Sequence, residues 1–215
     1  MKKKFLTILV VLAMTLSAKA QITLIPKLGV DISNVAFTGV GLNGTLMAGP
    51  KVGLVLGTAV EVGITDVLAV QPEILFIQKG YKRTNAGATT ISNVNYLEIP
   101  VLGKVKVKIQ NMTFFTIVGP AISLAISGKE KKGDETTAIK IGSENSNTKK
   151  IDFSLQFGAG VMYKNFVFDL RYGVSLTNSA VVTTGGDYST KNRVISITVG
   201  YSLPLEFKFL KNKKK

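Results

Sequence analysis

Histidine, cysteine and tryptophan are all absent from this 215-residue chain. Without His, the Ser-His and Asp-His arrangements of hydrolases have no general base. Without Cys, there is neither a thiol nucleophile nor a Cys/His zinc site. No glycine-rich loop leads into a helix, as a phosphate-binding loop would require, and the spacing of the carboxylates favours no acid–base pair. We therefore expect no catalytic residues, no cofactor and no metal, and hence a protein that is not an enzyme.

The N-terminus has the three parts of a secretory signal peptide. A basic cluster at residues 2–4 precedes an apolar run over residues 5–16, and Ala18-Lys19-Ala20 follows as a cleavage site before Gln21. An uncleaved anchor is the alternative, but the run is shorter than the ~20 residues that a spanning helix needs. We expect 1–20 to be a signal peptide and 21–215 to be one domain. An exported domain without cysteine has no disulfides, so its stability must come from a regular hydrogen-bonded framework or a membrane.

The formal net charge of +14 overstates how basic the body of the chain is, because lysines are concentrated in the signal and in a short C-terminal tail. Basic residues are not interleaved with aromatic residues on any continuous stretch, so a nucleic-acid partner is not expected. Two interpretations of the tail stay open: a solvated end, or contact with an anionic periplasmic surface.

Alternation of apolar and polar residues with a period of two is the dominant pattern. It is clearest over 151–163 and 166–176, which Lys164-Asn165 joins as a tight hairpin. The same rule predicts eight strands, at about 22–33, 47–63, 67–82, 93–107, 112–127, 150–163, 166–177 and 192–203. Short turns at 64–66, 108–111 and 164–165 alternate with long polar loops near 34–46, 83–92, 128–149 and 178–191, as in bacterial outer-membrane barrels.

The predicted fold is therefore all-β: an eight-stranded antiparallel up-and-down transmembrane β-barrel. Two alternatives remain. Residues 109–128 carry no charge and are long enough for a transmembrane helix, although their many β-branched and polar residues favour a turn and a strand. Strand parity also permits a secreted soluble lipid-binding barrel with the apolar side chains inside. The export signal and a mean hydropathy of +0.28 favour the apolar face outward.

Prolines and aromatic residues refine this prediction. Pro72, Pro100 and Pro120 fall inside predicted strands, where bulges or local breaks are expected because proline cannot donate to a ladder. Aromatic residues near the strand ends suggest interfacial girdles: Phe114, Phe115, Tyr163, Phe166 and Tyr201 toward the short turns, and Tyr81, Tyr96 and Phe153 toward the loops. Ordinary strand propensity is the alternative explanation.

Several segments resemble the PorT-type outer-membrane β-barrel family common in Bacteroidetes, which are Gram-negative. They are Gln71-Pro72-Glu73-Ile74-Leu75-Phe76 with Gln78-Lys79-Gly80-Tyr81, then Asn95-Tyr96-Leu97-Glu98-Ile99-Pro100, then Gly119-Pro120, and Asp169-Leu170-Arg171-Tyr172. The resemblance implies an eight-stranded barrel, inserted in outer-membrane lipid by the outer-membrane assembly machinery, with the three strand prolines as family features. It implies no shared activity.

Strand parity places five charged residues on the inner face as a lumen ion-pair network: Glu73, Glu98, Lys104, Asp169 and Arg171. Lys27, Asp31, Lys51 and Glu61 are its outer candidates. Buried charges persist by pairing, so we expect the network to plug the lumen; a narrow porin-like channel is the alternative. An even strand number places both termini in the periplasm. A surface or periplasmic protein partner would contact the long loops, above all 128–149, which otherwise are solvated.

Overall fold

The computed structural model describes residues 21–38, 46–85, 88–142, 148–178 and 189–205. The predicted signal peptide and most of the C-terminal tail lie outside these ranges. Eight long strands form the barrel: β1 (Ile22–Thr38), β3 (Lys51–Gly63), β4 (Leu68–Asn85), β5 (Ala88–Ile109), β6 (Met112–Lys132), β8 (Ile151–Tyr163), β9 (Phe166–Ser175) and β10 (Ser189–Tyr201). Three short strands accompany them: β2 (Leu46–Met47), β7 (Glu135–Ala138) and β11 (Leu203–Leu205).

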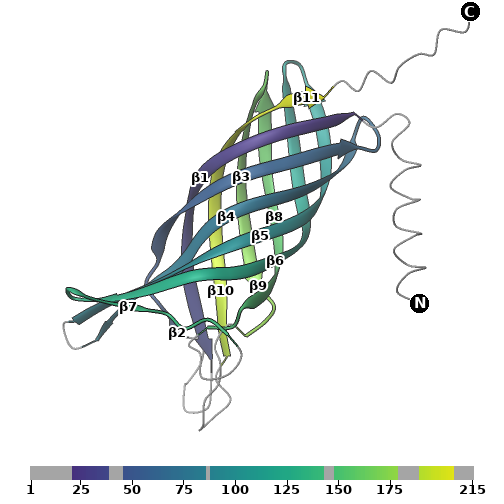
Figure 1. Cartoon of the computed structure of the whole chain (residues 1–215). Helices are drawn as coiled ribbons and strands as arrows, with labels where there is room; N and C mark the ends of the chain where they lie inside the picture. The colour runs from purple at the N-terminus through teal and green to yellow at the C-terminus, as the bar shows by residue number, and fades with distance from the viewer. Residues whose placement is uncertain (1–20, 39–45, 86–87, 143–147, 179–188, 206–215) are drawn as a thin grey trace, which may run out of the picture.

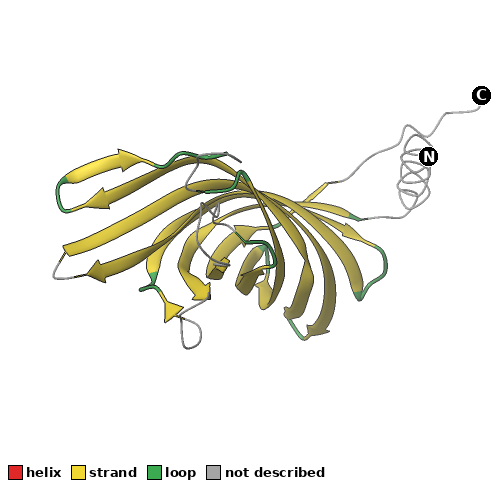
Figure 2. Cartoon of the chain, turned by 90° about the horizontal axis from the view of Figure 1, so that it is seen from below, coloured by secondary structure: helices red, strands yellow, loops and turns green. Residues whose placement is uncertain are grey.

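The eight long strands form a closed ring, visible in Figures 1 and 2. Each pairs antiparallel with the next long strand along the chain, and β10 returns to pair with β1 from Lys27↔Gly200 to Thr38↔Ser189. Closure leaves no open sheet edge along this seam. The predicted fold class is confirmed. The charge-free stretch 109–128 forms a turn and most of β6, and no helix of the described residues is long and apolar enough to cross a bilayer.

The two ends of the barrel differ. Short connections at 64–67, 110–111 and 164–165 define the turn end, where Gln110 and Lys164 adopt positive φ angles of 51° and 54°. The opposite end, the loop end, was only partly predicted. Residues 83–85 and 88–92 are strand and not loop, because β4 and β5 stay paired to Asn85↔Ala88. Similarly, β1 continues to Thr38, and β6 pairs with β7 as a hairpin within the predicted loop 128–149.

The strand prolines produce breaks without a change of register. Pairing of β4 with β5 skips from Pro72↔Val101 to Leu75↔Glu98, and pairing of β5 with β6 skips from Pro100↔Ala121 to Gly103↔Val118. The sequence therefore correctly predicted local disruption there. A register shift between β5 and β6 lies elsewhere, where Asn95 pairs with Ser127 but Tyr96 pairs with Ala125. This bulge inserts Ile126 and exchanges the two faces of β6 beyond it.

The apolar side chains face outward. An apolar band of exposed residues surrounds the ring, including Leu28, Val30, Leu54, Val101, Val118, Phe157, Leu170 and Ile197. Phe114, Tyr163, Phe166 and Tyr201 extend it at the turn end, as the girdle interpretation expects. Phe115 and Tyr96, by contrast, are buried in the lumen, which corrects their assignment to the girdles. An exposed apolar band around a polar interior is the pattern of a membrane barrel and is the reverse of a soluble one.

Candidate functional site in the barrel lumen

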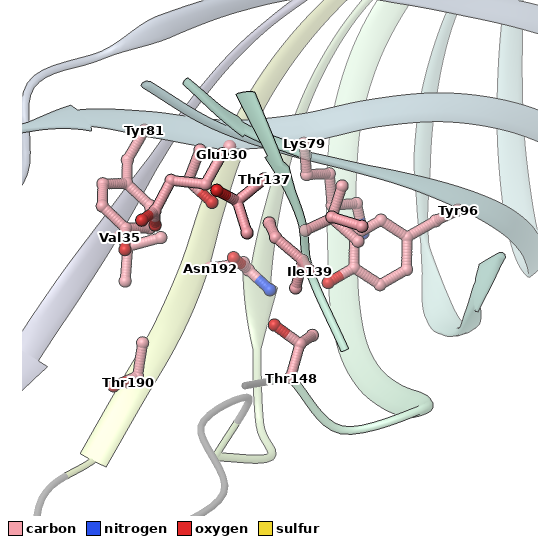
Figure 3. Close-up of a pocket in the computed structure, with 14 residues that line it drawn as sticks. Val35, Lys79, Tyr81, Tyr96, Glu130, Thr137, Ile139, Thr148, Thr190 and Asn192 are labelled. Carbon is pink, nitrogen blue, oxygen red and sulfur yellow. The ribbon is translucent and has the colours of Figure 1, made fainter. Parts of the chain in front are cut away.

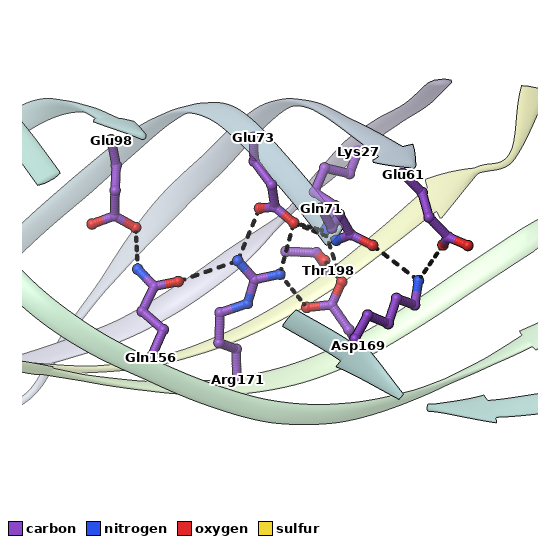
Figure 4. Close-up of polar contacts among 10 residues, drawn as sticks. Lys27, Glu61, Gln71, Glu73, Glu98, Gln156, Asp169, Arg171 and Thr198 are labelled. Atoms are coloured by element: carbon purple, nitrogen blue, oxygen red, sulfur yellow. Dashed lines mark hydrogen bonds and ion pairs between the residues drawn. The ribbon is translucent and has the colours of Figure 1, made fainter. Parts of the chain in front are cut away.

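The centre of the lumen is a cluster of four buried charges from β1, β4 and β9 (Figure 4). The guanidinium of Arg171 donates to the two oxygens of Glu73 at 2.9 and 3.1 Å and to Asp169 at 3.3 Å. The Lys27 ammonium contacts the same two carboxylates, Asp169 at 2.9 Å and Glu73 at 3.3 Å. Thr198 donates to Asp169 at 2.8 Å. Two cations and two anions therefore neutralise one another in the middle of the barrel.

Toward the turn end, a second group forms around Glu61. Its two oxygens accept from Lys104 at 2.7 Å and from Lys106 at 2.6 Å. The Lys104 ammonium also donates to Gln71 at 2.9 Å and lies 3.9 Å from the centroid of the Phe115 ring. The Gln71 amide in turn donates to Glu73. Gln71 therefore links this group to the central cluster.

Toward the loop end, Glu98 is the centre of a third group. It accepts from the Lys79 ammonium, from Ser123 at 2.7 Å and from Gln156 at 2.7 Å. The Gln156 oxygen accepts from Arg171 at 3.3 Å. The hydrogen-bonded path thus runs without interruption from Glu61 to Lys79. We call these side chains the lumen network: Lys27, Glu61, Gln71, Glu73, Lys79, Glu98, Lys104, Lys106, Ser123, Gln156, Asp169, Arg171 and Thr198.

The structure brings together all five residues that the sequence selected, Glu73, Glu98, Lys104, Asp169 and Arg171, and all five are buried. Of the outer candidates, Lys27 and Glu61 join the network. Lys51 does not; it donates to the Val52 carbonyl at 3.2 Å. Asp31 is fully buried, yet neither of its oxygens accepts a hydrogen bond from a described residue.

Lys79 was missing from the predicted set, although it forms the ion pair with Glu98. Its alternation with the apolar residues Leu75 and Ile77 gave a usable signal, because all three share the inward face of β4. Asp152 is another buried acid outside that set, and it accepts from Ser175 and Thr177, both at 2.6 Å, and from Asn192 at 3.1 Å.

A cavity of about 300 Å³ opens at the loop end, and Lys79 is among the residues that line it (Figure 3). Its walls include Tyr81, Tyr96, Glu130, Ile139 and Asn192. Below it, between Lys79 and Arg171, the lumen holds a cavity of only about 10 Å³, room for about one water molecule. We call the larger cavity the vestibule; it ends at the lumen network.

The arrangement offers little reactive chemistry. Every carboxylate of the lumen network is bound to at least one cation, so none is a free acid or base. The described residues contain no group of three or more potential metal ligands. What the arrangement can do is fill the lumen and fix the positions of all eight long strands relative to one another.

Comparisons with known proteins agree with this architecture. A family model described as an outer membrane protein beta-barrel domain matches residues 18–181. Among solved structures, OprG from Pseudomonas aeruginosa superposes with a TM-score of 0.53 at 11% identity, covering 87% of this chain and 98% of that one. Ail of Yersinia pestis gives 0.43 at 14% identity, covering 85% and 99%. The outer membrane enzyme PagL gives 0.39 at 12% identity, covering 81% and 99%.

The sequence of the chain finds no match among curated proteins. At identities this low, the OprG likeness shows the fold alone. The family model, however, covers most of the chain and both the ring and the apolar band fit it. The chain belongs to the outer membrane protein beta-barrel domain family, and its place is the outer membrane.

Proposed function

We propose that this protein is a non-enzymatic, non-conducting outer-membrane barrel with a structural or interaction role, whose lumen is plugged by the lumen network. The observation that carries the proposal is the uninterrupted path of ion pairs and hydrogen bonds from Glu61 through Glu73 and Arg171 to Lys79. An eight-stranded barrel is just wide enough for its side chains to fill. Two apolar clusters, around Val55 and around Leu102, occupy further parts of the interior.

Planar-bilayer recording tests the plug. We expect the wild-type protein to give no steady conductance, and the variant Lys27→Ala/Glu73→Ala/Arg171→Ala to conduct, because truncation removes the central cluster. A matched control, Arg83→Ala/Glu130→Ala/Lys132→Ala, removes three charges of the same signs near the loop end and should stay closed. Heat-modifiable migration on a gel confirms that each variant is folded. Large, steady currents from the wild-type barrel would contradict the proposal.

A narrow porin-like channel is the second candidate, and the vestibule of about 300 Å³ favours it, since it already gives solutes access to Lys79. In a channel, Lys79 and Arg171 would bias conduction toward anions. Steady, anion-selective currents from the wild type, together with cation-selective currents from the Lys79→Glu variant, would support the channel over the plug.

We further propose that both termini lie in the periplasm and that the PorT-type resemblance reflects insertion by the outer-membrane assembly machinery. In support, Gly63 donates to Gln21 and Ser202 donates to Asn165, so both ends of the described chain lie at the turn end. Short turns are periplasmic in bacterial barrels. On intact cells, we expect a membrane-impermeant thiol reagent to label a cysteine introduced at Asp134 but not one introduced at Asn165. A partner protein at the cell surface would then contact the loop end. A periplasmic partner would contact the C-terminal tail.

A further inference from the structure

Charges on the outer surface of the ring are few and of one sign. On the outward-facing positions of the eight long strands, the described residues include five charged side chains, and all five are basic and exposed: Lys82, Lys129, Lys131, Lys191 and Arg193. All five lie at the loop end, beyond the apolar band. None of them forms an ion pair with a described residue. The acidic residues of these strands face the lumen.

Three of these cations form a compact surface, which we call the basic tip face: Lys82, Lys129 and Lys131. Lys82 pairs with Ile91, and Ile91 pairs with Lys131, so the three residues lie in one row across β4, β5 and β6. At about 4.8 Å per strand, the two lysines are roughly 10 Å apart at their Cα atoms. Lys129 follows on the same face, two residues along β6.

The bulge at Ser127 creates this face. Without the inserted Ile126, the alternation of β6 would turn Lys129 and Lys131 into the lumen and Glu130 outward. With it, Glu130 pairs with the inward Ser92 and lines the vestibule. Glu135 pairs with Lys132, also on the lumen side. The insertion of one residue therefore places Lys129 and Lys131 on the opposite face from Glu130.

The position of the basic tip face relative to the membrane follows from the shape of the sheet. The ends of β4, β5 and β6, with β7, lean away from the barrel axis and project beyond the ring (Figures 1 and 2). When a strand bends outward, its outer face turns back toward the surface of the bilayer. The three lysines are then directed at the headgroup layer, with Ile91 between them and the apolar band below.

We propose that the basic tip face binds the phosphate groups of anionic lipids in the leaflet at the loop end. Lysine ammonium groups each have three donors and suit phosphate oxygens. Each cation next to the membrane surface strengthens the binding of anionic headgroups by about a factor of five. Two phosphates of one or two lipids can bridge the row from Lys82 to Lys131, which contains no carboxylate. This proposal depends on membrane location and is independent of whether the lumen conducts.

The test compares two pairs of neighbouring charges on the same two strands. Full-length protein is reconstituted in nanodiscs of equal amounts of phosphatidylglycerol and phosphatidylcholine, and the lipids retained after transfer to detergent are counted by native mass spectrometry. Lys82→Gln/Lys131→Gln removes two positive charges from the outer face. Arg83→Gln/Lys132→Gln removes two from adjacent positions on the lumen face. Heat-modifiable gel migration verifies that both variants are folded.

We expect the wild type to retain phosphatidylglycerol preferentially. The Lys82→Gln/Lys131→Gln variant should lower this preference about twenty-fivefold, at about fivefold per lysine, and the Arg83→Gln/Lys132→Gln variant less than twofold. Equal losses in both variants, or no preference in the wild type, would overturn the proposal. So would tripolyphosphate binding to the lipid-free protein through Lys82 and Lys131 in the absence of any lipid preference, since that identifies a site for soluble polyanions.

Discussion

The middle of the lumen and the projecting tip are built from the same strands, yet they treat charge in opposite ways. In β4, Glu73 is buried and bound by two cations, whereas Lys82 is exposed and forms no ion pair with a described residue. In β5, the buried Glu98 pairs with Lys79, whereas Lys129 and Lys131 of β6 face outward and form no ion pair within the described part of the chain. Burial removes water and makes an unpaired charge costly. Exposure removes that requirement and leaves the tip cations available to an external ligand.

The largest effect should follow from breaking the central cluster. Glu73→Ala leaves Arg171 and Lys27 with Asp169 as their shared carboxylate, and removing one partner from a buried pair costs about 3–5 kcal/mol. Glu130→Ala, in the tip, should change stability by less than about 0.5 kcal/mol, as is usual for surface sites. Urea unfolding of the barrel in lipid vesicles measures both. Similar losses in the two variants would mean that lumen charges are no more dependent on their partners than tip charges.

A lysine introduced on the outer face should distinguish the band from the tip along one strand. Val101 is exposed in the apolar band of β5, and Thr89 lies on the same face beyond it. Val101→Lys should cost about 2–4 kcal/mol, because hydrocarbon surrounds the new charge, and Thr89→Lys about 0–1 kcal/mol. The same unfolding measurement applies. A tolerated lysine at Val101 would place the bilayer elsewhere on the barrel.

The inward and outward faces of the ring could be predicted because alternation requires only local sequence. In β9, for example, the alternation of Phe168 and Leu170 with Asp169 and Arg171 already distinguishes the lipid-facing side from the lumen side. The pairing partners could not be predicted in the same way. Glu73 and Arg171 are 98 residues apart and meet only because strand tilt and register bring β4 opposite β9 across the lumen. The inward position of Lys79 was predictable from its alternation with Leu75 and Ile77, but its ion pair with Glu98 on β5 was not.

The tip was harder to predict than the lumen. Residues 83–85, 88–92 and 128–132 are rich in charged residues and threonine, a composition typical of solvated loops, but their backbones are paired with neighbouring strands. The bulge at Ser127 also exchanges the inward and outward faces for every later residue of β6. No residue type at Ile126 or Ser127 marks it. A one-residue shift exchanges the faces, so parity carried past this point assigns Lys129 and Glu130 to the wrong sides.

Crowding should also differ between the two faces of the ring. A Cβ added at Gly119, on the lumen side, would meet the carbonyl oxygen of Val101, and the Leu102 Cα would lie 2.9 Å away. These are backbone atoms of the neighbouring strand and cannot move cheaply. At the outward Gly103, the nearest atom would be 3.6 Å away. Gly119→Ala should therefore cost about 1–3 kcal/mol and Gly103→Ala less than about 0.5 kcal/mol in the same unfolding assay.

The smallest effects should come from the hairpins at the two ends. Lys164, at the turn end, has a φ of 54°, and Gly133, between β6 and β7, has a φ of 59°. A side chain in this left-handed region costs about 1–2 kcal/mol. Lys164→Gly should thus raise the free energy of unfolding by about 0.5–1 kcal/mol, because this turn joins two strands of the ring.

Gly133→Ala is the reverse change, because it introduces a side chain at a positive φ angle, in a hairpin that projects from the ring. Since β7 pairs only with β6 among the described strands, the hairpin can open without disrupting the barrel. Global unfolding should therefore be unchanged to within about 0.5 kcal/mol. Amide hydrogen exchange at Lys132 and Glu135 should instead become about five- to thirtyfold faster, the ratio that corresponds to the strain energy. If Gly133→Ala lowered global stability as much as Lys164→Gly raises it, the tip would be part of the cooperative unit of the barrel, and its exposed cations would be held as rigidly as the lumen network.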